Sequence, residues 1–116
     1  METLIKLYED FLFESLDKEL EFTEFAKARL AGATKIAEEA KKKGGPAMLT
    51  HYHFVVKLPY YKKAASGKFD QDKAMAEMNK KVAELEKGGV DLQQIKFQKI
   101  VGIIEVLGEL LIRFKS

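Results

Sequence analysis

The sequence contains no cysteine, and this absence removes several kinds of chemistry at once. Without thiols the chain can form neither a disulfide, a zinc–thiolate centre nor a cysteine nucleophile. Cysteine usage therefore does not indicate whether the protein works in an oxidising or a reducing compartment. There are also no internal repeats, no low-complexity tracts and no linker long enough to separate domains. We therefore expect residues 1–116 to form a single domain, large enough to bury a core.

Long apolar runs are also missing. The most apolar stretch, Ile100–Phe114, is shorter than the ~20 residues of a membrane span, and two glutamates interrupt it. No N-terminal segment has the basic, apolar and small-residue pattern of a secretory signal. We therefore expect no membrane contact and a location in the cytoplasm.

Apolar residues recur at helical spacing through most of the chain, and this pattern predicts an all-α fold. We expect a compact bundle of four to five helices with a highly apolar C-terminal helix. The predicted segments are an acidic amphipathic helix over 1–16, a helix from about Asp17 or Thr23 to Lys43, one from Pro46 to a break before Pro59, a short segment over 60–66, one from Asp70 to Gly88, and one beginning at Asp91. Asp70 and Asp91 are the expected caps, and two Gly-Gly pairs are the expected stops. A strand over 52–58 is the minority alternative, because this stretch is rich in β-branched and aromatic residues.

The C-terminal segment is apolar on every side except for a strip formed by Glu105, Glu109 and Arg113, a spacing that allows Glu109 and Arg113 to pair. Such a helix must be enclosed by other helices or by a second subunit. Gly102 and Gly108 each cost ~1 kcal/mol relative to alanine, which suggests that another helix passes close by. We predict a homodimer, with this interface set: Ile100, Ile104, Leu107, Leu111 and Phe114.

Charge is segregated although the net charge is only +2. Residues 1–24 carry eight acids and two lysines, a balance of −6, whereas residues 41–69 carry seven lysines and no acid. The simpler interpretation is that the acidic helix docks on the basic segment, or that both faces are solvated. The alternative is a nucleic-acid or acidic-partner surface, for which the candidate residues are Lys41, Lys42, Lys43, Lys57, Tyr60, Tyr61, Lys62 and Lys63.

Catalytic and metal signals are weak. His51 and His53 diverge by ~200° on a helix, so they cannot share a metal there. Thr50 and Ser66 belong to no recognisable serine–histidine–acid arrangement. Gly44-Gly45-Pro46 could present amide groups to a phosphate, but a helix stop followed by a helix start explains it more simply. We expect no metal, no cofactor and no enzymatic activity.

Two stretches are similar to known proteins. Residues 1–15, METLIKLYEDFLFES, resemble the short amphipathic leaders of proteins from large contractile-tailed bacteriophages and their marine relatives, although Glu2 replaces the usual lysine. In some of those proteins the leader directs entry into the prohead and is cut after an aliphatic-x-Glu motif, which Leu12-Phe13-Glu14 matches. Segments 32–46 and 53–63 resemble small uncharacterised helical proteins of marine phages and environmental sequences.

These resemblances imply a phage or phage-like accessory protein that contacts itself or another phage protein, in the host cytoplasm or the virion. A nucleic-acid-binding module that uses residues 41–69 is the alternative. The N-terminal helix could be a cleavable leader or a structural element. Its eight apolar residues favour the structural role, in which it lies across the lysines of 41–69 and its removal costs several kcal/mol.

Overall fold

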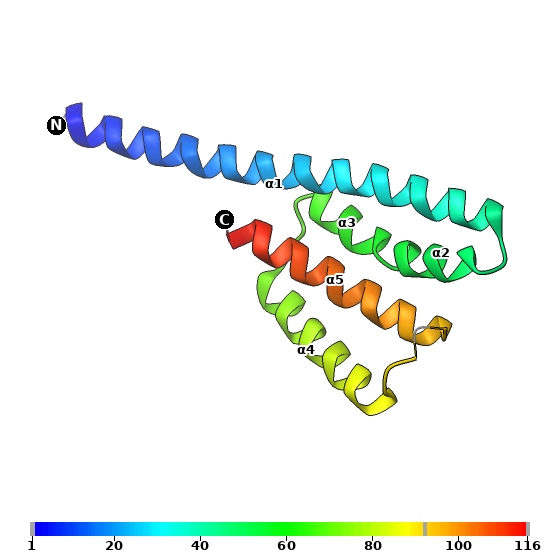
Figure 1. The fold of residues 1–116 in the computed structure, drawn as a ribbon. Helices are drawn as coiled ribbons and strands as arrows, with labels where there is room; N and C mark the ends of the chain where they lie inside the picture. Colours follow the sequence, from blue (N-terminus) through cyan, green and yellow to red (C-terminus); the bar gives the residue numbers. More distant parts are fainter. Residues whose placement is uncertain (1, 92, 116) are drawn as a thin grey trace.

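The computed structural model describes residues 2–91 and 93–115, with side chains described from Leu20 onward. Within this part the protein is an all-α bundle, as predicted, in which five helices follow one another along the chain (Figure 1). The helices are α1 (Glu2–Lys43), α2 (Ala47–Val55), α3 (Leu58–Ala65), α4 (Gln71–Gly88) and α5 (Ile95–Lys115).

The first two predicted helices are one continuous helix, so the predicted boundary near residues 17–23 is wrong. No glycine or proline interrupts the chain before Gly32. Thr23, the proposed start of the second helix, hydrogen-bonds back to the Leu20 carbonyl oxygen at 3.0 Å and caps nothing. At ~1.5 Å per residue the 42 residues of α1 should span about 63 Å, in agreement with the longest dimension of the molecule, 66 Å.

Helices α2 and α3 return antiparallel along the C-terminal half of α1 (Figure 1). The turn uses Gly44 and Gly45, both at positive φ, where side chains are strained. Alanines of α1 are buried at the contact and allow close approach, as their spacing predicted. The break between α2 and α3 falls where expected, because Pro59 in the first turn of α3 has no N–H to continue the hydrogen-bond ladder.

Helices α4 and α5 form an antiparallel hairpin. Asp70 caps α4 by accepting a hydrogen bond from the Lys73 N–H at 3.2 Å, and Gly89 follows the helix with φ of 71°, as predicted. The second expected cap is only partly correct. Asp91 accepts from the Gln93 N–H at 3.1 Å and holds a turn, and α5 begins later, at Ile95.

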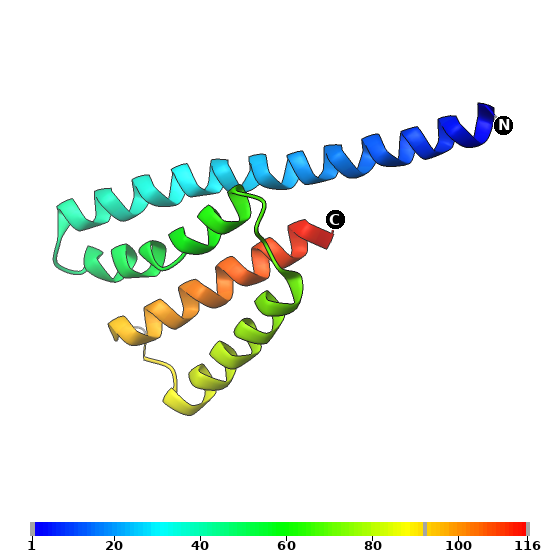
Figure 2. The same ribbon diagram turned by 180° about the vertical axis from the view of Figure 1, so that it is seen from behind.

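Helix α5 lies between α4 on one side and α2 and α3 on the other (Figures 1 and 2). Its residues Val106, Leu107 and Leu110 are the largest fully buried side chains among the described residues. Most of the apolar surface of α5 is therefore enclosed within one subunit, while Ile95 and Ile112 remain exposed. This corrects the predicted interface, because Ile100, Leu107 and Leu111 lie in the core, Ile104 is half-buried, and only Phe114 remains 45% exposed.

The N-terminal half of α1 extends beyond the bundle (Figure 2). Helices α2 and α3 together span residues 47–65. Nineteen residues of helix are only ~28 Å long, so α2 and α3 can lie along less than half the length of α1. We call residues 2–19 the arm. The expectation that this helix lies across the lysines of residues 41–69 is wrong, because the unbroken helix carries the arm away from α2 and α3 (Figures 1 and 2).

Candidate functional site

The polar strip of α5 is the first cluster of ionisable groups in the fold, and it faces the neighbouring helices. Glu105 accepts hydrogen bonds from His53 Nε2 at 2.6 Å and from Lys57 Nζ at 2.9 Å. Lys57 is only 8% exposed, and its ammonium lies 4.8 Å from the centre of the Phe54 ring. Burial raises the pKa of Glu105, but the hydrogen bonds from Lys57 and His53 outweigh it and hold this pKa below its ordinary value.

One turn further along α5, Glu109 joins α5 to α3 and α1. It accepts a hydrogen bond from the Tyr61 hydroxyl at 2.7 Å and lies 3.4 Å from Arg29 Nε. The predicted partner, Arg113, has its guanidinium 4.9 Å from the centre of the Phe25 ring. Burial, reinforced by the hydrogen bond to Glu109, raises the pKa of Tyr61 well above its usual value, so the phenol stays protonated.

The geometry of Glu105 gives a pH-dependent prediction. Because its pKa is lower in the folded state than the ordinary 4.5, its contribution to stability is present above that pH and is lost as the pH falls through the folded value. Glu105→Gln should lower the free energy of unfolding by about 1–2 kcal/mol at pH 7, because it leaves the buried ammonium of Lys57 without its charged partner. The loss is no larger because solvent partly screens the half-exposed carboxylate of Glu105.

The measurement is urea unfolding of both proteins at several pH values. The difference between wild type and Glu105→Gln should be full at pH 7 and should shrink as the pH falls below about 4.5. An equal difference at pH 7 and pH 3 would show that the Glu105 carboxylate does not stabilise Lys57 through its charge. Glu86→Gln, at an exposed position on α4, is the matched control and should change little at either pH.

The predicted nucleic-acid residues do not form one surface. Lys41, Lys42 and Lys43 are exposed at the C-terminal end of α1, and Lys62 and Lys63 are exposed on α3. Some fifteen residues of helix, ~23 Å, separate the two groups. The other three candidates are engaged inside the bundle: Lys57 by Glu105, Tyr61 by Glu109, and Tyr60 by Glu77. Their assignment to a binding surface is therefore corrected.

The remaining sequence candidates also have structural roles. His51 Nδ1 lies 2.8 Å from the Ala37 carbonyl oxygen of α1, whereas His53 faces α5, so the two histidines diverge as their spacing predicted. Within the described residues no group of three or more histidine, aspartate or glutamate side chains converges as a metal site. The amides after Gly44-Gly45-Pro46 are used in local turns, for example Ala47 N–H to the Gly44 oxygen at 3.2 Å, which argues against a phosphate cradle.

This dispersal of the lysines gives a second prediction. At physiological salt the protein should show no retention on single- or double-stranded DNA, because phosphate binding needs several lysines on one continuous surface. The triple variant Lys41→Gln, Lys42→Gln, Lys43→Gln should behave identically in the same assay. Retention that weakens steeply with salt, and that this variant reduces without a change in melting temperature, would establish the nucleic-acid alternative.

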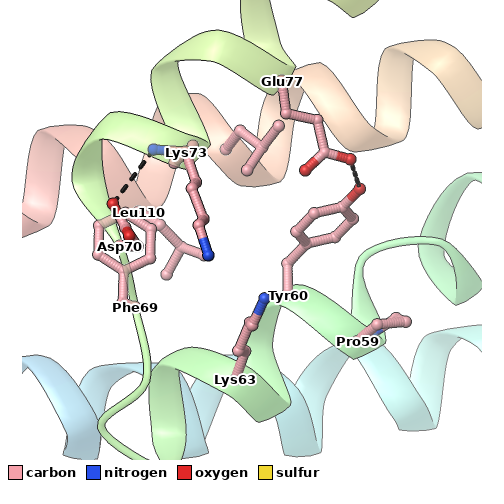
Figure 3. A pocket seen from close by; sticks show the side chains of 10 residues that line it. Pro59, Tyr60, Lys63, Phe69, Asp70, Lys73, Glu77 and Leu110 are labelled. Atoms are coloured by element: carbon pink, nitrogen blue, oxygen red, sulfur yellow. Dashed lines mark hydrogen bonds between the residues drawn. The ribbon is translucent and has the colours of Figure 1, made fainter.

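A pocket with a volume of about 260 Å³ opens between α3 and α4 (Figure 3). Its floor is apolar and is formed by Ala74 together with Leu107 and Leu110 of α5. The Tyr60 hydroxyl donates a hydrogen bond to Glu77 across one wall, and the side chains of Lys63 and Lys73 reach the opening from opposite sides (Figure 3). Burial, followed by the hydrogen bond to Glu77, raises the pKa of Tyr60, so its hydroxyl remains a donor.

Comparison of the chain with family models, with curated proteins and with solved structures finds no match. Among the helices of the described residues, none is both long enough and apolar enough to cross a membrane. The arm, the polar strip and the pocket are the structural features that bear on function.

Proposed function

We propose that this protein is a non-enzymatic interaction protein that works as a homodimer, with the arm of α1 as its principal contact element. The observation that carries this proposal is the length of α1, whose first eighteen residues, the arm, extend beyond the other helices of the same subunit (Figure 2). A helix projecting alone into water gains little from its own hydrogen bonds, because most helical stability in proteins comes from packing of an apolar face.

The sequence of the arm supplies such a face. Leu4, Tyr8, Phe11, Leu12 and Leu16 recur at helical spacing. The apolar surface continues at the base of the arm, where Leu20 is 61% exposed and Phe114 packs its ring 5.4 Å from that of Phe22. A stable interface needs about 800 Å² per partner, and aromatic residues such as those of the arm can each bury ~150–250 Å².

Charge favours a second copy of the chain as the occupant of this surface. Residues 1–24 have a balance of −6. Two exposed lysines, Lys62 and Lys68, lie on α3 and the loop after it, next to Phe69, whose ring packs 5.2 Å from Phe22 at the base of the arm. In a two-fold dimer with antiparallel arms, the acidic end of each arm would meet these lysines of the partner.

The resemblance of residues 1–15 to phage leaders supports a phage or phage-like setting for this assembly, in the host cytoplasm or the virion. The motif Leu12-Phe13-Glu14 lies within the arm. Cleavage after Glu14 would therefore shorten the contact element while leaving the chain from Leu20 to Lys115, which holds the described core, intact. In that setting a maturation step would convert the dimer into a free bundle or release it to a phage protein partner.

Sedimentation at micromolar concentration tests the proposal. The full chain should be a dimer, whereas a chain starting at Ser15 and the variant Leu12→Asp should both be monomers. Val90→Asp is the control, since Val90 is 79% exposed in the loop between α4 and α5 and should leave the dimer unchanged. A full chain that sediments as a clean monomer would overturn the proposal.

The same truncated chain distinguishes the roles of the arm. Because α2 and α3 cover only the C-terminal half of α1, the chain starting at Ser15 should still unfold cooperatively at a concentration where both proteins are monomeric. Its melting temperature should lie within a few degrees of that of the full chain. A loss of several kcal/mol would mean that the arm packs on its own bundle, as the sequence alone had favoured.

A further inference from the structure

We infer that the pocket between α3 and α4 is a binding site for a small amphipathic anion, a carboxylate or sulfonate carried on an apolar body. The inference is independent of the dimer, because it rests on the pocket alone. Its floor consists of core residues, with Leu107 2% exposed and Leu110 and Ala74 also buried, so a ligand entering it would touch packed apolar surface.

The rim supplies the charge. Lys63, from α3, and Lys73, from the first turn of α4, extend toward the opening from opposite sides (Figure 3). Among the described residues neither ammonium group has an ion-pair partner. By contrast, Lys57 in the polar strip pairs with Glu105 at 2.9 Å, and Lys81 on α4 pairs with Glu84 at 3.4 Å. The two groups are therefore free to donate to an anion placed between them.

The acids of the lining are already engaged by neutral donors. Glu77 accepts from the Tyr60 hydroxyl, and Asp70 accepts from the Lys73 backbone N–H at 3.2 Å as the cap of α4. Burial raises the pKa of Tyr60 and keeps its hydroxyl protonated, so the hydrogen bond from Tyr60 to Glu77 is present at ordinary pH. What the pocket lacks is a negative group between Lys63 and Lys73, and an apolar body on its floor.

The size of the pocket limits the ligand. A volume of about 260 Å³ lies just below the range of ~300–1,000 Å³ typical of sites for drug-sized molecules. It suits a single ring or a short aliphatic chain. Octanoate has such a chain and one carboxylate, and octylamine has the same chain with the opposite charge, so the two form a matched pair of probes.

The test is a titration of the full-length protein with each probe, followed by amide chemical shifts in two-dimensional NMR spectra. Octanoate should shift amides that line the pocket, including those of Phe69, Lys73 and Ala74, whereas octylamine should shift none of them. The double variant Lys63→Gln, Lys73→Gln should weaken octanoate binding at least tenfold. Its melting temperature should stay within about 2 °C of wild type, since both side chains are exposed.

The double variant Lys42→Gln, Lys80→Gln is the matched control. It removes the same charge from exposed positions that do not line the pocket, so it should bind octanoate as wild type does. Equal binding of octylamine, or unchanged octanoate binding by the Lys63/Lys73 variant, would overturn the inference. Absence of shifts at millimolar octanoate, or shifts confined to other parts of the molecule, would do the same.

Discussion

Replacing Gly102 by alanine should destabilise the protein by about 2–4 kcal/mol, although the same change usually stabilises a helix. A Cβ atom at this position would lie 2.3 Å from the backbone oxygen of His53 and 2.7 Å from Cγ2 of Val56. The first of these atoms belongs to the backbone of α2 and can move only if α2 moves. The substitution therefore forces α2 and α5 apart and weakens the contacts of Lys57 and His53 with Glu105.

Gly108→Ala is the matched control on the same helix. Its Cβ would meet Sδ of Met78 at 3.9 Å, which is an ordinary contact. Alanine is the better helix former by ~1 kcal/mol, so this variant should be more stable than wild type by about 0.5–1 kcal/mol. Urea unfolding followed by circular dichroism measures both effects. If Gly102→Ala were as stable as Gly108→Ala, α2 and α5 could not be packed as closely as the structure shows.

These two glycines illustrate what sequence can and cannot predict. Their position inside an apolar helix indicated that another helix passes close by, and the structure confirms this for Gly102, which packs against α2. Nothing in the sequence distinguishes Gly102 from Gly108, because the close contact depends on where α2 crosses α5. That crossing is decided by the packing of residues about fifty positions apart, such as His53 and Glu105.

The helix boundaries were predictable wherever a local signal marks them. Asp70, Gly89 and Pro59 act through their own backbone or side chain, and each stands where the helix begins or ends. The predicted division of α1 had no such signal. It placed a second helix start at Asp17 or Thr23, but no glycine or proline before Gly32 stops the helix that precedes them.

The candidate site was predictable only in part. The strip of Glu105, Glu109 and Arg113 was visible from its spacing, and the structure places it against α1, α2 and α3. Its partners His53, Lys57, Tyr61 and Arg29 were hidden, since lysines and tyrosines along 52–63 fit a nucleic-acid surface as well as the interior of a bundle. Only the pairing of α2 and α3 with α5 decides between these interpretations.

The largest effect expected from a single substitution is that of Leu107→Asp. Leu107 is 2% exposed and lies in the core cluster with Val106 and Leu110. Loss of the leucine side chain from such a position costs about 2–5 kcal/mol. A carboxylate buried without a partner adds several more. Since a domain has only ~5–15 kcal/mol of stability in total, the variant should be unfolded at 25 °C.

Ile112→Asp provides the comparison, because Ile112 stands on the same helix but is 74% exposed. It should change the free energy of unfolding by no more than about 1 kcal/mol. Circular dichroism and sedimentation of both variants separate the two possible positions of Leu107. Loss of helical signal in Leu107→Asp alone is the result expected of a core residue within one subunit. A Leu107→Asp protein that remained helical and merely became monomeric would return Leu107 to the subunit interface, where the sequence alone had placed it, and would contradict the enclosure of α5 by its own chain.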